Sequence, residues 1–142
     1  MTEPETQQPA TIYQLKITLN DSDPLIWRRV QTPDCSLSWL HEIIQSAMGW
    51  EDAHLHEFSV GDRKYVGSPI NHTRDEENGE SGRLSEIVAA GHKKFRYWYD
   101  FGDDWMHTIK VEETFPALED VHYPRCDGGE GACPPEDCGG VW

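Results

Sequence analysis

The stretch 93-KKFRYWYDFGDDWMHTIKVEET-114 contains the clearest fold signal in the chain. Apolar and aromatic side chains alternate on both sides of Gly102-Asp103-Asp104, which has the turn chemistry of a tight β-hairpin. We therefore predict two long strands, residues 93–101 and 105–114. The first of them carries rings on both faces, so we expect it to be a central strand or one that is covered on both sides.

Further strands are predicted upstream of this hairpin. Residues 12–19 alternate with a period of two, and the turn cluster 20–24 separates them from an extended stretch at 26–30. The two segments should pair as an antiparallel hairpin. Residues 54–60 alternate again, and residues 64–66 supply a short partner strand.

Two helices complete the expected elements. Apolar residues recur at steps of three and four along residues 37–48, which predicts an amphipathic helix capped by Asp34 or Ser36 and ending before Gly49. A brief second helix is expected at 84–90. The order of strands and helices predicts an α+β fold, in which helices pack on one face of a mainly antiparallel sheet.

Length and charge limit the domain count and the classes of partner. The chain has 142 residues, the size of one domain, which we divide into a disordered leader (1–11), a core domain (12–120) and a Cys/Gly/Pro-rich tail (121–142). It carries 12 Lys and Arg against 26 Asp and Glu, a formal net charge of −14. That charge disfavours free nucleic acid and favours a basic protein partner or a bound cation.

The apolar content predicts the cellular location. Residues 1–10 lack the apolar core of a signal peptide, and no stretch of the sequence approaches the length of a membrane span. We therefore expect a soluble, cytoplasmic protein that does not associate with a membrane.

The tail, residues 123–140, reads Y-P-R-C-D-G-G-E-G-A-C-P-P-E-D-C-G-G. Gly, Pro, Asp and Glu surround its three cysteines, so we expect neither helix nor strand there. In a reducing compartment such a cluster suggests zinc, with Cys126, Cys133, Cys138 and His122 as ligands. The spacing is looser than that of paired C-x2-C knuckles, and a glycine-rich loop with reduced thiols is the alternative.

Four segments together resemble one family. They are residues 13–29 with L-K-I-T-L and D-P-L-I-W-R-R-V, residues 37–58 with M-G-W and H-L-H-E-F, residues 97–112 with Y-D-F-G-D-D-W-x-H-x-I-x-V-E, and the C-P-P-E-D-C-G-G element. In this order they resemble the plasmid pRiA4b ORF-3-like family over about residues 11–142. The resemblance implies a compact α+β domain of uncharacterised function.

The family resemblance bears on two further points. Members are sometimes labelled as passenger or resolvase-like products of insertion elements, which suggests an accessory DNA-processing protein of a mobile element. The sequence contains no serine-recombinase pattern, and its charge opposes that function. Similar proteins usually continue past C-G-G into a tyrosine-containing turn and an acidic helical tail, whereas this sequence ends at Val141-Trp142, which indicates a truncated chain or a short member.

A metal-dependent enzyme is the main alternative function. Its ligands would come from two groups of side chains: His54, His56 and His107, and Asp100 and Asp104. Strand alternation separates several of these residues, however, and a histidine on an apolar row is typical of a core residue. Cys35 precedes a predicted helix, where its thiol is either activated or simply buried. The sequence contains no standard nucleophile or phosphate-binding motif.

Our leading hypothesis is a non-enzymatic module that docks a protein or peptide. Aromatic residues are plentiful, and carboxylates flank them in the 97–105 region. If one face of this hairpin is open, its rings would bind a peptide or a cationic segment. The expected surface consists of Trp98, Tyr97, Tyr99 and Trp105.

The zinc hypothesis makes a direct prediction. Protein purified without a metal-binding tag should contain stoichiometric zinc by elemental analysis, and a Cys133→Ser, Cys138→Ser variant should lose it. Metal retained in the variant would instead indicate the histidine and aspartate groups. Absence of metal from both proteins would contradict both metal hypotheses and leave a binding module with reduced thiols.

Overall fold

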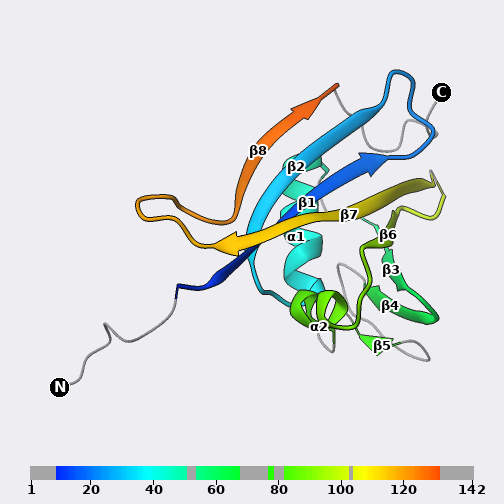
Figure 1. The fold of residues 1–142 in the computed structure, drawn as a ribbon. Helices are drawn as coiled ribbons and strands as arrows, with labels where there is room; N and C mark the ends of the chain where they lie inside the picture. Colours follow the sequence, from blue (N-terminus) through cyan, green and yellow to red (C-terminus); the bar gives the residue numbers. More distant parts are fainter. Residues whose placement is uncertain (1–8, 51–53, 68–76, 79–81, 103, 132–142) are drawn as a thin grey trace.

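The computed structural model describes residues 9–50, 54–67, 77–78, 82–102 and 104–131 (Figure 1). Within them lie eight strands and two helices. In chain order these elements are β1 (Thr11–Leu19), β2 (Ile26–Pro33), α1 (Leu37–Met48), β3 (His56–Val60), β4 (Arg63–Gly67), β5 (Glu77–Asn78), α2 (Leu84–Ala89), β6 (Lys94–Tyr99), β7 (Trp105–Pro116) and β8 (Arg125–Glu130).

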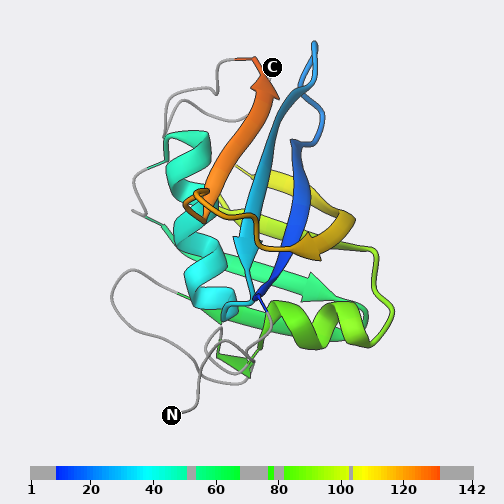
Figure 2. The same cartoon turned by 60° about the vertical axis from the view of Figure 1, so that its left-hand side comes forward.

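All the described strands form one sheet in the order β5-β4-β3-β6-β7-β1-β2-β8. Every pairing is antiparallel except that of β5 with β4. The sheet twists so strongly that β1, β2 and β8 run across the direction of β3 and β4 (Figure 2).

The predicted hairpins are confirmed. β1 pairs with β2 from Ile12 opposite Pro33 to Leu19 opposite Ile26, β3 pairs with β4, and β6 pairs with β7. These pairings join strands that are close in sequence, so strand alternation and turn chemistry suffice to predict them.

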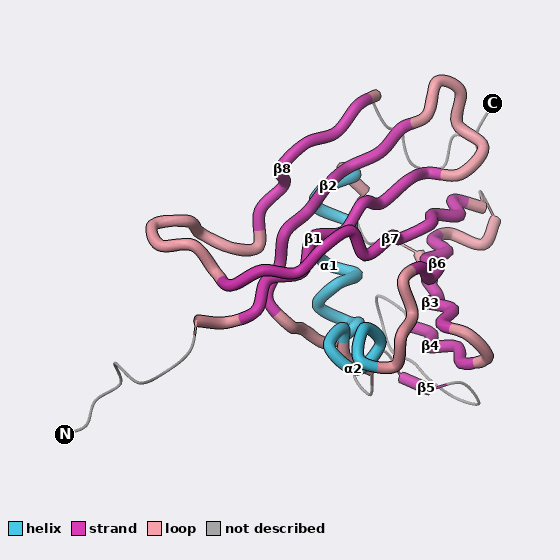
Figure 3. Tube along the Cα trace, in the orientation of Figure 1, coloured by secondary structure: helices cyan, strands magenta, loops and turns pink. Residues whose placement is uncertain are grey.

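The α+β prediction, with helices packed on one face of the sheet, was wrong. Of the described residues, 50% lie in strands and 17% in helices, and the two described helices are short and form no layer over the sheet (Figure 3). Most of the buried apolar side chains lie on strands, because the twisted sheet curves around much of the core itself. The sequence pattern identified each helix correctly but does not show how much of the core the strands supply.

Both helices begin and end at recognisable residues. The side chain of Ser36 accepts a hydrogen bond from the Trp39 amide at 3.1 Å and caps α1, whereas Asp34 accepts from the Ser85 amide at 2.8 Å at the start of α2. Gly49 ends α1 in the left-handed conformation, at φ 80°. The choice left open between Asp34 and Ser36 is thus decided for Ser36.

The tail contains a strand that the sequence analysis did not expect. β8 pairs with β2, and Cys126 lies opposite Val30. A side chain at Gly129 would meet the Trp27 carbonyl oxygen at 2.7 Å, so this position needs glycine for the two backbones to approach. Pairing with β2 therefore overrides the poor strand propensity of this segment.

A search for membrane-spanning segments covered the described residues. None of their helices is both long enough and apolar enough to cross a membrane. The shortness of α1 and α2 accounts for this result.

The core makes one prediction about stability. Leu40 on α1 is fully buried, whereas its neighbour Trp39 is 52% exposed. Leu40→Ala should lower the free energy of unfolding by about 2–5 kcal/mol, because it leaves a cavity. Trp39→Ala should change it by less than about 1 kcal/mol. Urea denaturation measures both values, and equal losses would contradict this assignment of the buried face of α1.

Candidate functional site

The hydroxyl of Tyr97 connects α1 to the sheet. It lies 2.7 Å from Nδ1 of His41 and accepts a hydrogen bond from Nε2 of Gln45 at 2.8 Å. All three side chains are buried, and His41 and Gln45 lie one helical turn apart on the face of α1 that enters the core. These hydrogen bonds fix the rotation of α1 relative to β6.

The guanidinium of Arg28 connects α1 to the opposite end of the sheet. Its Nε donates to the Ala47 carbonyl in the last turn of α1 at 3.1 Å. Its two terminal nitrogens donate to the carbonyls of Glu130, at 3.1 Å, and Gly131, at 2.9 Å. Arg28 therefore holds the C-terminal end of α1 at a fixed distance from the end of β8.

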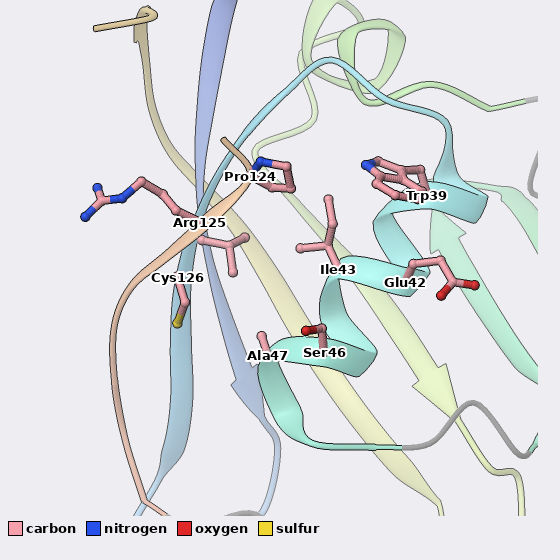
Figure 4. A pocket seen from close by; sticks show the side chains of 9 residues that line it. Trp39, Glu42, Ile43, Ser46, Ala47, Pro124, Arg125 and Cys126 are labelled. Carbon is pink, nitrogen blue, oxygen red and sulfur yellow. The ribbon is translucent and has the colours of Figure 1, made fainter. Parts of the chain in front are cut away.

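A groove lies between α1 and β8 and has a volume of about 410 Å³ (Figure 4). Val30 and Ile43, both buried, lie at its floor together with Ala47. Its walls are Trp39, Glu42 and Ser46 of α1 on one side, and Pro124, Arg125 and Cys126 on the other. It is therefore an apolar groove with a half-exposed tryptophan on its rim.

The charge at this groove comes mainly from α1. Arg125 points away from α1 in Figure 4, donates to Oε1 of Gln31 at 2.8 Å, and lies 3.1 Å from Oδ1 of Asp127. Its charge is thus already engaged with other side chains. Glu42 remains as the acidic group on the wall formed by α1.

The ligands predicted for a metal-dependent enzyme are only partly brought together. Nε2 of His54 lies 3.3 Å from Oδ2 of Asp100, and the ring of His56 stacks on that of His41 with centroids 3.6 Å apart. Within the part of the chain that the structure describes, no three His, Cys, Asp or Glu side chains are arranged to hold a metal ion.

His107 occupies a core position. It is fully buried, and its Nδ1 lies 3.2 Å from the Tyr97 carbonyl oxygen. Burial lowers the pKa of His107 to about 4, although the backbone hydrogen bonds of the ring act in the opposite direction. Its Nε2 has no hydrogen-bond partner among the described residues. The ring is therefore neutral at physiological pH and sealed from solvent.

The two aspartates serve the turn between β6 and β7. Asp100 and Asp104 both have positive φ, 57° and 63°, a conformation that Asp tolerates better than most residues. Oδ1 of Asp104 accepts a hydrogen bond from the Trp98 indole at 2.6 Å. Asp104 is exposed, whereas Asp100 and His107 are buried, so the three do not line one pocket.

Of the predicted zinc ligands, His122 and Cys126 are described, and both are exposed. Cys133 and Cys138 lie outside the described residues, so the zinc hypothesis stays a prediction. Cys35 is buried, and burial raises the pKa of its thiol to about 11. The activated-thiol reading of Cys35 is therefore wrong, and the structural reading holds.

The predicted aromatic binding surface is divided between the two faces of β6. Tyr97, Tyr99 and Trp105 have no exposed surface and belong to the core. Trp98 points to the other face, is half-buried, and stacks on Phe101 with ring centroids 4.2 Å apart. The three core rings are therefore not available to a partner.

Sequence reasoning did not find the groove or the residues that position it. His41 and Gln45 interrupt the apolar face of the predicted helix at i and i+4, and this buried polar pair was a usable signal. The groove itself combines residues 39–47 with residues 124–126. No local pattern connects segments so far apart.

Comparison with known proteins gives consistent matches. The family model described as "Plasmid pRiA4b ORF-3-like protein" matches residues 11–142. The chain is 43% identical over 141 residues to "Uncharacterized protein y4hQ" of Sinorhizobium fredii (strain NBRC 101917 / NGR234), covering 94% of this chain and 69% of that protein. A crystal structure of the protein of unknown function MM3350 from Methanosarcina mazei Go1 superimposes with a TM-score of 0.83 at 36% identity, covering 94% of this chain and 77% of that one.

The buried histidine predicts a pH dependence. The pKa of His107 is about 4 in the folded chain and about 6.5 in an unfolded one. Between these two pKa values the unfolded state binds more protons than the folded state. The contribution of His107 to the free energy of unfolding is therefore fully present above pH 6.5 and is lost as the pH drops toward 4. A single such group contributes about 3 kcal/mol to the loss.

Replacement of the histidine isolates this contribution. The free energy of unfolding, measured in urea between pH 7 and pH 4, should fall less steeply in His107→Gln than in the unmodified chain. His122→Gln, an exposed histidine replaced in the same way, should leave the slope unchanged. Parallel pH profiles for His107→Gln and the unmodified chain would contradict the lowered pKa.

Proposed function

This chain belongs to the plasmid pRiA4b ORF-3-like family, and we propose that it is a protein-interaction module that binds a peptide segment of a partner in the groove between α1 and β8. The observation that carries the proposal is the combination of an apolar floor with an exposed Trp39 on the rim. Exposed tryptophans beside apolar hollows are typical anchors of peptide and protein interfaces.

The floor of the groove suits an apolar side chain. The floor is aliphatic, with Ala47 partly exposed and Val30 and Ile43 buried, and a volume of about 410 Å³ admits one or two large side chains of a peptide. Trp39 would lose its remaining exposure when such a peptide covers it. Burial of this ring together with an anchor side chain would supply most of the binding free energy.

Charge favours a basic partner. The chain carries a net charge of −14, and Glu42 lies on the groove wall. A Lys or Arg next to the anchor residue would meet Glu42, while the overall field would accelerate the encounter. We therefore assign the groove to a peptide with an apolar anchor and an adjacent basic residue.

The backbone of β8 adds a further means of binding. β8 is the last strand in the order of the described sheet, and β2 pairs with only one of its edges. A strand edge offers N–H and C=O groups to an extended peptide. A segment that enters the groove beside residues 124–126 could extend the sheet in this way.

The enzyme alternative receives less support from the same geometry. Its candidate ligands are distributed between the core, the edge near Asp100 and the exposed turn at Asp104. The groove, in contrast, gathers an anchor surface and an acidic group in one place. Binding is thus the function that the described residues support best.

Selection from a random peptide library displayed on phage tests the proposal. Peptides enriched on the intact chain should combine an aromatic or leucine anchor with Lys or Arg. Titration of a synthetic copy should show at least ~10-fold weaker binding to Trp39→Ala, which removes the anchor surface. Glu42→Lys should also weaken binding, and more strongly at low salt.

Leu25→Ala provides the matched control. Leu25 is 56% exposed and lies in the β1–β2 turn, away from the groove-lining residues, so its removal should leave peptide affinity unchanged. A library without enriched peptides, or peptides that bind Trp39→Ala as tightly as the unmodified chain, would overturn the proposal. The same titration on a chain ending at residue 131 shows whether residues 132–142 compete for the groove.

A further inference from the structure

Helix α1 lies on one side of the sheet (Figure 1), and we call the other side the outer face. The strand register places several basic side chains on this outer face. The chain has only 12 Lys and Arg residues in total. Lys94 of β6 lies directly opposite Lys110 of β7, and Lys110 lies directly opposite Lys16 of β1. We call these three residues the lysine row.

The register places all three lysines on one surface. Residues directly opposite each other in adjacent strands point to the same face, and the alternate residues Phe95, Ile109 and Leu15 are buried in the core. Lys94 and Lys110 are exposed, and Lys16 is half-buried, with Nζ 4.8 Å from the centre of the Trp27 ring. The row spans roughly 10 Å across three strands.

Carboxylates accompany most other cations of this face, and Glu112 also interacts with Lys16 of the row, but Lys94 and Lys110 have no such partner among the described residues. Arg29, opposite Lys16, makes a bidentate pair with Glu112 at 2.7 and 3.1 Å, and Lys64 lies 3.6 Å from Glu57. Among the described residues, no ion pair involves Lys94 or Lys110. Their charges are therefore open to solvent.

Such a row is unfavourable for folding alone. Like charges directly opposite each other destabilise a sheet, and an acidic residue between two lysines would be stabilising instead. In a chain with 26 Asp and Glu, the row still places Lys94 and Lys110 directly opposite each other without a carboxylate partner among the described residues. A negatively charged ligand would offset this repulsion.

We infer that the lysine row binds an acidic segment of a partner protein. The alternate side chains of an extended peptide lie about 6.6 Å apart, so two or three carboxylates match the length of the row. Arg96, exposed on the same strand and face as Lys94, adds a further cation beside it.

The surroundings favour a short peptide over a nucleic acid. Along β7 the patch is bounded by Asp104 just before the strand and by Glu112 and Glu113 within it. A polyphosphate chain would extend beyond the row onto these acids and into the field of a molecule with a net charge of −14. A segment with only two or three carboxylates stays within the basic patch.

Fluorescence anisotropy tests this inference with a labelled peptide of alternating Glu and Thr. The intact chain should bind it, and the affinity should fall as salt is raised. Lys110→Glu should weaken binding at least ~10-fold, since it reverses the central charge of the row. Its melting temperature should stay the same or rise, because the new carboxylate pairs with both flanking lysines.

Arg63→Glu is the matched control, because it makes the same change of net charge. Arg63 is exposed and lies opposite the core residue Val60, on the other face of the sheet, so this variant should keep its affinity. The inference would be overturned if the intact chain did not bind the Glu/Thr peptide, or bound a Gln/Thr peptide equally well. It would also be overturned if both variants lost the same affinity, or if an oligothymidine bound more tightly than the Glu/Thr peptide. The lysine row does not line the groove, so Trp39→Ala should leave acidic-peptide binding intact.

Discussion

The position of α1 depends above all on the hydrogen bonds of Arg28. This guanidinium joins the last turn of α1 to the carbonyls that end β8, while β2 itself provides the arginine. The charged guanidinium donates hydrogen bonds to carbonyl groups at the end of the helix and at the end of the strand. Without it, these carbonyls would have to accept hydrogen bonds from water. At the other side of α1, the Tyr97 hydroxyl holds His41 and Gln45. With both attachments in place, α1 and β8 stand apart at a fixed width, and the groove is the space between them.

The packing of α1 on the sheet also explains why part of the candidate ligand set of the enzyme hypothesis lies in the core. The face of β6 and β7 that meets α1 must be apolar or internally hydrogen-bonded, so Tyr97 and His107 are committed to the core. Next to them the indole nitrogens of Trp50 and Trp105 are buried without a hydrogen-bond partner among the described residues. Each such group costs about 1–3 kcal/mol. The interior thus contains polar aromatic groups whose nitrogens are not all hydrogen-bonded within the described residues.

Local chemistry made much of the fold predictable, and long-range pairing made the rest unpredictable. Alternation and turn residues identified the β1–β2, β3–β4 and β6–β7 hairpins, and Gly49 marked the end of α1. The fold class failed because the β1–β7 and β2–β8 pairings join segments about a hundred residues apart. β8 also lacks an apolar pattern, and the close approach of β2 accounts for the glycine at position 129. The groove and the lysine row both depend on these pairings, which a single sequence does not display.

The two proposed binding surfaces are physically separate although their residues are neighbours in the chain. On β2, Val30 lies at the floor of the groove, whereas Arg29 points to the outer face and pairs with Glu112 beside the lysine row. This separation follows from the period of two in a strand, which sends consecutive side chains to opposite faces. The acidic charge of Glu42 and the basic charge of the lysine row therefore do not neutralise each other across the sheet. If both proposals hold, two partners of opposite charge would bind on opposite faces of the sheet and would not compete for one surface.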